Sequence, residues 1–278
     1  MSAPASVPRA IVYRTRGITH GPITRLMSPS DLGQVLKPFI FLDLVNFQAG
    51  RLNQGFGMHP HSGIATVTFL SQGDVRYEDT TGQSGLLPAG GVEWMRAGNG
   101  VWHSGSPVGE APGLGFQLWV ALPADLENAA AQNQYLAPEL VPRIGPVRVL
   151  LGDYGLARSP VAAPAGMTYL SVSLAKGERW TYTPPVGHTV AWVAVAAGRL
   201  EAAESIHAGE LVAFADSNAS IELLATEATS LVLGSAVPHP HELVMGHYSV
   251  HTSQEALDQG EAELRRIRQQ LREAGRLG

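Results

Sequence analysis

The 278-residue chain lacks cysteine, an excess of basic residues and long hydrophobic runs. Without cysteine it has no disulfide, thiolate ligand or cysteine nucleophile, so a bound metal would need histidine or carboxylate ligands. With 19 basic and 24 acidic residues, the net charge of −5 makes nucleic acid and anionic lipid unexpected partners. No run approaches the length of about 18 apolar residues that indicates a membrane span, and the first residues lack the apolar core of an export signal. We therefore expect a cytoplasmic protein with no membrane partner.

Glycine and proline are abundant, with 31 and 19 residues, and they divide the chain into short apolar segments. These segments are rich in β-branched and aromatic residues: "ATVTFLSQG", "GFQLWVALP", "VRVLLG", "YLSVSLAKG", "TVAWVAVAAG", "ELVAFA" and "TSLVLGS". Short strands bounded by turn formers at intervals of roughly 8–12 residues are typical of β-sandwiches and β-barrels. The sequence therefore predicts an all-β fold.

The two halves of the chain are weakly similar to each other. "FLSQG" ends at Gly73 and is followed by "PAGGVEWM", whereas "AVAAG" ends at Gly198 and is followed by "HAGELVAF". This repeat predicts two related barrels, and we place them at residues 1–135 and 136–251. The proline-containing segment 122–146 has no sustained periodicity, which indicates a connection.

Residues 252–278 have the pattern of a helix rather than a strand. Thr252 and Glu255 have the spacing of a capping box, in which each side chain binds a backbone N–H at the helix start. Four aliphatic residues recur at helical spacing and predict one apolar stripe: Leu257, Leu264, Ile267 and Leu271. Gly260 should weaken this helix by roughly 1 kcal/mol relative to alanine. Glutamates alternate with the arginines near its end, so we interpret that end as a solvated face rather than a nucleic-acid site.

The segment "GFGMHPHSG" contains two histidines separated by one proline, His59 and His61. On a strand, side chains two positions apart lie on one face, with Cα atoms about 6.5–7 Å apart. The two imidazoles can therefore converge on one ion, and Pro60 suits an edge or the start of a strand because it donates no ladder hydrogen bond. The alternative is a pair of histidines that are hydrogen-bonded in a loop.

A third histidine strengthens the metal hypothesis. His103 follows several glycine and proline turns, 42 positions after His61. This separation allows a neighbouring antiparallel strand to bring a third imidazole to the pair. The candidate ligands are therefore His59, His61 and His103.

The segments that carry these histidines resemble a known family. "GMHPHSGIATVTFLSQGDVRYEDTTGQSG", "WMRAGNGVWHSGSP" and "QLWVALP" occur in the order found in the pirins, which are two-barrel cupins, and "GHYSVHTSQEAL" resembles the end of a pirin. The similarity covers about residues 10–255. It implies an all-β bicupin of two barrels packed side by side, with a C-terminal helix and a metal in the N-terminal barrel only.

The resemblance also implies a ligand set of two histidines in an H-P-H motif, a third histidine and a glutamate two positions later. The histidines match His59, His61 and His103, but the glutamate position is Gly105, and Ala65 stands where pirins usually have another glutamate. Three neutral imidazoles leave the charge of a divalent ion uncompensated, which should weaken binding and open a position for water or substrate. The resemblance implies Fe(II), with Mn, Ni, Zn and Cu as alternatives, in a site that is partly filled.

Pirin relatives cleave the flavonol quercetin oxidatively, and the glutamate ligand is the natural base for the flavonol hydroxyl. The resemblance therefore implies a metal-dependent dioxygenase that acts on a small aromatic substrate, but no catalytic residue is assigned. Glu78, Asp79 and Glu93 are candidates to replace the missing carboxylate, although we expect a structural role for each. The alternatives are a non-catalytic regulatory protein that acts through a protein partner and a scaffold whose metal site has decayed.

Other histidines lie in the second half of the chain. His188 has no partner histidines at matching positions, so we expect it to be hydrogen-bonded in a barrel without a metal. "PHPHE" at residues 238–242, with His247 and His251, forms a histidine-rich region. It aligns with the pirin segment that leads into the C-terminal helix, so no physiological metal is expected there.

Overall fold

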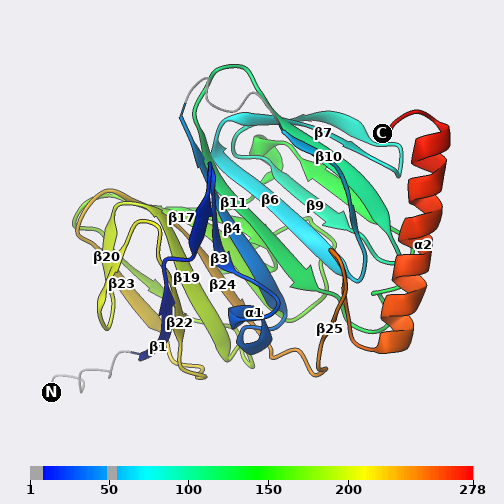
Figure 1. Ribbon diagram of the computed structural model, residues 1–278. Coiled ribbons are helices and arrows are strands. Elements are labelled where there is room, and N and C mark those ends of the chain that lie inside the picture. The colour runs from blue at the N-terminus through cyan, green and yellow to red at the C-terminus, as the bar shows by residue number, and fades with distance from the viewer. Residues whose placement is uncertain (1–8, 49–54, 278) are drawn as a thin grey trace, which may run out of the picture. The chain divides into compact units, whose positions relative to one another are not determined.

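The computed structural model describes residues 9–48 and 55–277, and the chain divides into two compact units (Figure 1). The N-terminal unit comprises Ile18–Val141 and His239–Gly278, so it includes the C-terminal helix. The C-terminal unit comprises Met1–Gly17 and Pro142–Pro238. Strands dominate both units, which confirms the all-β prediction. No helix in the described part of the chain has the length and apolarity needed for a membrane span.

The N-terminal unit contains two large sheets. Its seven-stranded sheet has the order β12-β9-β6-β11-β4-β3-β2, with bounds Gln132–Leu136, Val92–Arg96, Ile64–Gln72, Gly113–Ala121, Phe39–Phe47, Ile23–Met27 and Ile18–His20. Its four-stranded sheet has the order β5-β10-β7-β8, with bounds Phe56–His61, Val101–Val108, Asp74–Asp79 and Ser84–Leu87. All pairings in both sheets are antiparallel.

The C-terminal unit repeats this arrangement. Its seven-stranded sheet has the order β1-β22-β19-β24-β17-β14-β13, with bounds Ile11–Thr15, Leu211–Phe214, Val190–Ala197, Thr229–Ala236, Met167–Leu174, Val147–Leu151 and Arg143–Ile144. Its four-stranded sheet has the order β18-β23-β20-β21, with bounds Arg179–Tyr182, Ile221–Ala225, Arg199–Glu201 and Ser205–His207.

The matching strand orders explain the weak similarity between the two halves of the sequence. The segments compared in the N-terminal half form β6 and β9, which pair, and those in the C-terminal half form β19 and β22, which also pair. The seven apolar segments predicted as strands are β6, β11, β14, β17, β19, β22 and β24. Each half of the sequence thus encodes the same order of paired strands.

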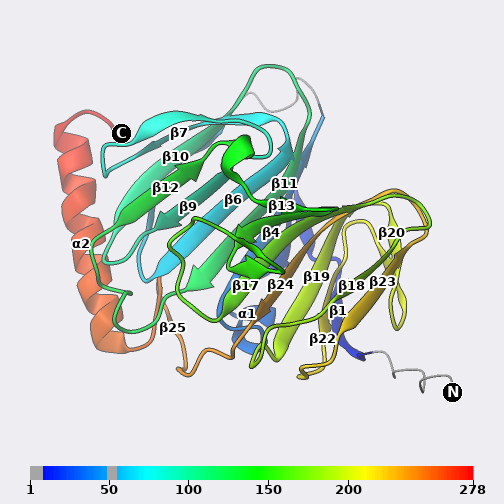
Figure 2. The same ribbon diagram turned by 180° about the vertical axis from the view of Figure 1, so that it is seen from behind.

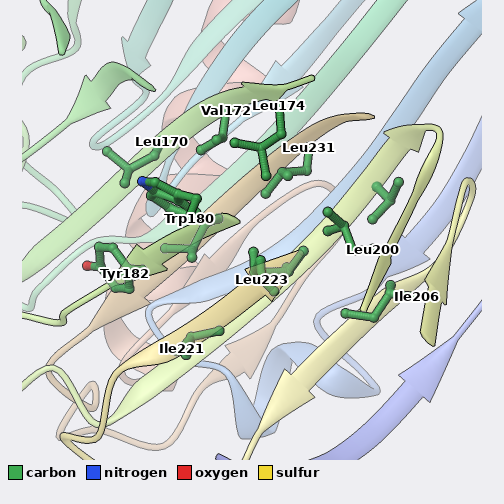
Figure 3. Packing of buried hydrophobic residues seen from close by; sticks show 14 of the residues in the cluster. Leu170, Val172, Leu174, Trp180, Tyr182, Leu200, Ile206, Ile221, Leu223 and Leu231 are labelled. Carbon is green, nitrogen blue, oxygen red and sulfur yellow. The ribbon is translucent and has the colours of Figure 1, made fainter. Parts of the chain in front are cut away.

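An apolar core fills the interior of the C-terminal unit (Figure 3). In its four-stranded sheet, β18 and β23 occupy the positions that β5 and β10 occupy in the other unit. These two strands bury Trp180, Tyr182 and Leu223 among aliphatic side chains, and each such burial contributes about 1.5–3 kcal/mol. His188 is buried, and its Nδ1 lies 3.1 Å from Ser235 Oγ, as expected for a hydrogen-bonded histidine.

The helix predicted at the end of the chain is α2, Gln254–Glu273, which lies beside β10 (Figure 1). The predicted apolar stripe is buried, and three of its residues pack with Trp102 of β10. The predicted capping box is wrong, because Ser253 is the N-cap and accepts a hydrogen bond from the Ala256 N–H. Thr252 instead donates its backbone N–H and its hydroxyl to Glu127. Thr252 thus binds Glu127, which is distant in the sequence, instead of the neighbouring Glu255.

The segment predicted as a connection, residues 122–146, is only partly a connection. It contains β12, which pairs with β9 at the edge of the seven-stranded sheet (Figure 2). Gln132–Leu136 is polar in sequence and lacks a clear alternation, so its assignment to a sheet depends on the neighbouring strand.

Candidate metal centre

Two neighbouring strands bring the three candidate histidines together. His59 and His61 lie on β5, and His103 lies on β10 directly opposite His59 in the antiparallel register. The ring centroids are 4.3 Å apart for His59 and His103, and 5.0 Å apart for each pair that includes His61. Within residues 9–48 and 55–277, this is the one group of three or more metal-ligating side chains, and its donor atoms all lie within 4.8 Å of one another.

Hydrogen bonds fix which nitrogen the rings of His59 and His61 offer. His59 Nδ1 donates to the Gly57 carbonyl at 2.8 Å, and His61 Nδ1 donates to the Tyr248 carbonyl at 3.3 Å. A carbonyl only accepts, so in both rings Nδ1 carries the hydrogen and Nε2 has a free lone pair. Nε2 of His61 and of His103 is buried without any partner. Orphaned, neutral imidazole nitrogens that converge are a donor set suited to a divalent transition metal.

Burial keeps the three imidazoles neutral. It lowers the pKa of His61 to about 3, and the neighbouring His59 adds to the effect. The pKa of His103 is well below its usual value because of burial and the two other imidazoles. Burial also lowers the pKa of His59, although its bond to the Gly57 carbonyl opposes this. Neutral rings are the form that binds metal, so protons compete little near neutral pH.

Acid should therefore destabilise the metal-free protein through these rings. The unfolded chain protonates His61 below about pH 6.5 while the folded chain does not, so the contribution of His61 to the free energy of unfolding is constant above that pH and falls below it. From pH 8 to pH 5 this one histidine should remove about 2 kcal/mol. We expect His61→Gln to lose that much less stability over this range, as measured by urea unfolding of chelator-treated protein. A pH dependence of His61→Gln that equals that of the wild-type protein would contradict the prediction.

A cavity of about 580 Å³ opens next to His59, and we call it the large cavity. Two parallel aromatic rings, Phe41 and Trp119, form part of its wall with centroids 4.0 Å apart. Arg25 lies 3.9 Å from the Phe41 ring centroid and donates two hydrogen bonds to Asp43. The large cavity thus combines aromatic side chains with an ion pair of zero net charge, a lining that suits a small aromatic molecule.

A second cavity of about 80 Å³, the small cavity, lies on another side of the histidines. His59, His103, Glu93 and Gly105 all line it. The Glu93 carboxyl is buried, and its Oε1 lies 4.0 Å from His103 Nδ1. Burial raises the pKa of this carboxyl, as does the nearby Asp79, while hydrogen bonds partly offset the shift. The small cavity therefore contains a buried carboxyl close to His103.

The three carboxyls considered as replacements for the missing glutamate lie in different surroundings. Glu78 forms an ion pair with Arg276 at the surface. Asp79 is buried and accepts hydrogen bonds from the side chains of Thr81, Asn133 and Tyr135, which indicates a structural role. Only Glu93, of these three, lines the small cavity. Ala65 is fully buried on β6 and lines neither cavity.

The histidine-rich segment before the helix contributes to the site through other groups. Val244–Met245 (β25) pairs with Val250–His251 (β26), and the hairpin between them carries Tyr248 beside the large cavity. The sequence reasoning missed Tyr248, whose ring lies 5.9 Å from His61 between centroids. The clustering of histidines drew attention to this segment, but nothing local in it indicates that a tyrosine carbonyl binds His61.

Comparisons with known proteins assign this chain to a family. The pirin family model matches residues 22–120. A Pseudomonas aeruginosa relative named "Putative quercetin 2,3-dioxygenase" is 31% identical over 253 residues, which cover 86% of this chain and 88% of the relative. The chain belongs to the pirin family. Human pirin is 34% identical over 159 residues, 55% of this chain and 54% of that protein.

A solved structure is similar to this chain over nearly its whole length. The crystal structure of a quercetin 2,3-dioxygenase from Acinetobacter baumannii is similar to this chain with a TM-score of 0.85 at 25% identity. The similarity covers 94% of this chain and 98% of that one. The bicupin prediction is therefore confirmed, and the chain is a pirin-like cupin with a three-histidine cluster.

Proposed function

We propose that this pirin binds one divalent transition-metal ion through Nε2 of His59, His61 and His103, and that it is a dioxygenase of small hydroxylated aromatic substrates. The observation that carries the proposal is the convergence of three neutral imidazoles, two of them with buried and unpartnered Nε2 atoms, beside an aromatic-lined cavity. A bound ion would supply the redox and Lewis-acid chemistry that activates dioxygen and substrate. Fe(II) is the expected ion for such a histidine set.

The proposal includes an incomplete ligand set. Gly105 lies two positions after His103 on β10, pairs with Tyr77 and lines the small cavity with His103 and His59. We infer that it stands where the pirin resemblance places a glutamate ligand. Without that carboxylate the ion keeps its full charge, so we expect weak, substoichiometric metal in the purified protein.

The residues of the chain then act mainly by binding and orienting the substrate. The Phe41 and Trp119 rings line the large cavity and offer a substrate apolar contact, although their facing sides are stacked on each other and Arg25 covers the other face of Phe41. The cavity volume of about 580 Å³ suits a ligand of flavonol size. Gln117 lines both cavities and offers amide hydrogen bonds to substrate hydroxyls. The names of the Pseudomonas and Acinetobacter relatives support a quercetin-like substrate.

Elemental analysis and oxygen uptake test the proposal. The chelator-treated protein is loaded with Fe(II), Mn(II) or Ni(II) and assayed with a panel of flavonols, with His103→Ala as the control. We expect one equivalent of metal at saturation, one O₂ consumed per flavonol and loss of both in His103→Ala. Metal binding without oxygen uptake for any flavonol would contradict the dioxygenase and favour the regulatory alternative. Metal retained by His103→Ala would contradict the site itself.

A further inference from the structure

The hairpin before α2 contacts the histidine cluster through the ring and the backbone carbonyl of Tyr248. The Gly246 N–H donates to the Ser249 carbonyl at 2.8 Å and closes a tight turn. Within this turn Tyr248 has φ = 61°, the one positive φ of a residue other than glycine in the described chain. This left-handed backbone places the Tyr248 carbonyl 3.3 Å from His61 Nδ1. A residue held in a sparsely populated conformation beside a candidate site suggests a role in that site.

A buried polar chain anchors this hairpin. Ser62, the residue after His61, has its Oγ 2.6 Å from His251 Nε2, and His251 Nδ1 lies 3.3 Å from Glu127 Oε2. All three of these side chains are at most 3% exposed. The Val250 N–H also donates to the Ser62 carbonyl at 3.2 Å. The end of β5 and the hairpin are therefore held together by two contacts at Ser62, the residue next to His61.

The serine, histidine and glutamate have the order of a hydrolase triad, but their position excludes that role. Ser62 is fully buried, and neither Ser62 nor His251 lines the large or the small cavity. A nucleophile must reach its substrate, and this hydroxyl reaches only the imidazole. The contacts of the three residues instead connect β5, the hairpin and the start of α2.

We infer that Tyr248 is a positioning residue whose backbone carbonyl holds the His61 ring with Nε2 toward the other two histidines, and that the Ser62–His251–Glu127 chain keeps the hairpin in the required place. The inference rests on the proposed metal site, since it assigns the orientation of one of its ligands. Partners of the second ring nitrogen of a metal-binding histidine typically change metal affinity 10–100-fold.

Two substitutions at position 248 separate the effect of the backbone conformation from the effect of the tyrosine ring. Both Tyr248→Asn and Tyr248→Val remove the ring, but asparagine tolerates a left-handed backbone, whereas a β-branched residue does not. We measure the His61 tautomer by ¹⁵N NMR in metal-free protein and the affinity for Co²⁺ by titration. Tyr248→Asn should keep the Nδ1–H tautomer and an affinity within about threefold of wild type. Tyr248→Val should show mixed tautomers and bind Co²⁺ 10–100-fold more weakly.

A second pair of variants covers the case in which Tyr248→Val does not fold. Ser62→Ala removes the hydroxyl from His251, and we expect mixed tautomers of His61 and about tenfold weaker Co²⁺ binding. The matched control, Asn128→Ala, loses 3.0 Å hydrogen bonds to the Asn99 side chain and to the Ala256 carbonyl of α2 but none to the hairpin, and it should bind Co²⁺ as wild type does.

The readouts distinguish this inference from the proposed function. Equal tautomers and affinities in Tyr248→Asn and Tyr248→Val, or in Ser62→Ala and Asn128→Ala, would overturn the positioning role. Absence of Co²⁺ binding in the wild-type protein would instead overturn the metal site. The tautomers of the metal-free protein would still test the role of Tyr248 in that case.

Discussion

Gly105→Glu should raise the affinity of the protein for divalent metal by about a hundredfold or more, which corresponds to roughly 3 kcal/mol. Residues 103 and 105 pair with Asp79 and Tyr77 of β7 in uninterrupted register, so their side chains lie on the same face of β10. His103 and Gly105 line one cavity. A carboxylate at position 105 would place a negative charge beside three neutral ligands.

The backbone at Gly105 accepts a side chain. Its φ is not positive, and a Cβ there would meet only Val75 Cγ1 at 3.5 Å, an ordinary contact. The Glu93 carboxyl lines the same cavity, and burial raises its pKa. A negative charge in this cavity is therefore costly without a nearby cation. The new carboxylate should therefore be favoured mainly when metal is bound.

Titration of chelator-treated protein with Co²⁺ or Ni²⁺ measures this effect. Gly105→Gln is the matched control, because it adds almost the same volume without the charge, and it should bind metal within a few-fold of wild type. If oxygenase activity on flavonols is limited by the missing base, Gly105→Glu should also increase it. Equal metal affinities for the glutamate and glutamine variants would show that residue 105 does not face the ion.

Gly260→Ala should destabilise the protein by about 2–4 kcal/mol, although alanine is the better helix former by roughly 1 kcal/mol. Gly260 is buried in α2 and faces the Ser62–His251 hydrogen bond. A Cβ at this position would lie against Ser62 Oγ and 2.7 Å from His251 Nε2. Both side chains are buried, and because protein interiors are close-packed, we expect the new methyl group to displace one of them and break the hydrogen bond between them.

Urea unfolding of Gly260→Ala, Ser62→Ala and the double variant tests whether the loss of stability comes from the contact with Ser62. Removing the Ser62 hydroxyl creates space for the new methyl group, so the two substitutions should be non-additive, and the double variant should recover at least about 1 kcal/mol of the sum. A Gly260→Ala protein that is more stable than wild type would show that helix propensity outweighs packing at this position.

The sequence alone determined the features that depend on local pattern. Segments rich in β-branched and aromatic residues and bounded by turn residues predicted seven of the strands, because these residue types pack well in a buried sheet and glycine and proline end it. The spacing of Leu257, Leu264, Ile267 and Leu271 predicted the buried stripe of α2. The H-P-H motif and His103 predicted the histidine cluster, since side chains two apart on a strand share a face.

Only the tertiary structure decided the features that join distant segments. The strand Ile11–Thr15 belongs to the C-terminal unit because it pairs with β22, about 200 positions away in the sequence. Thr252 has the pattern of a helix cap, but it binds Glu127, a buried carboxylate that its own helix does not supply. The sequence predicts that Gly260 weakens the helix. The structure shows that the absence of a side chain at this position leaves space for His251.

The arrangement of the three clustered histidines depends on both the local sequence and the tertiary structure. Residue type and spacing bring the imidazoles together, but the carbonyl that fixes the His61 tautomer comes from Tyr248, 187 positions later in the chain. A backbone carbonyl occurs in every residue and leaves no signature in the sequence. Its position depends on a left-handed turn and on the buried contacts that hold it, so only the folded chain reveals it.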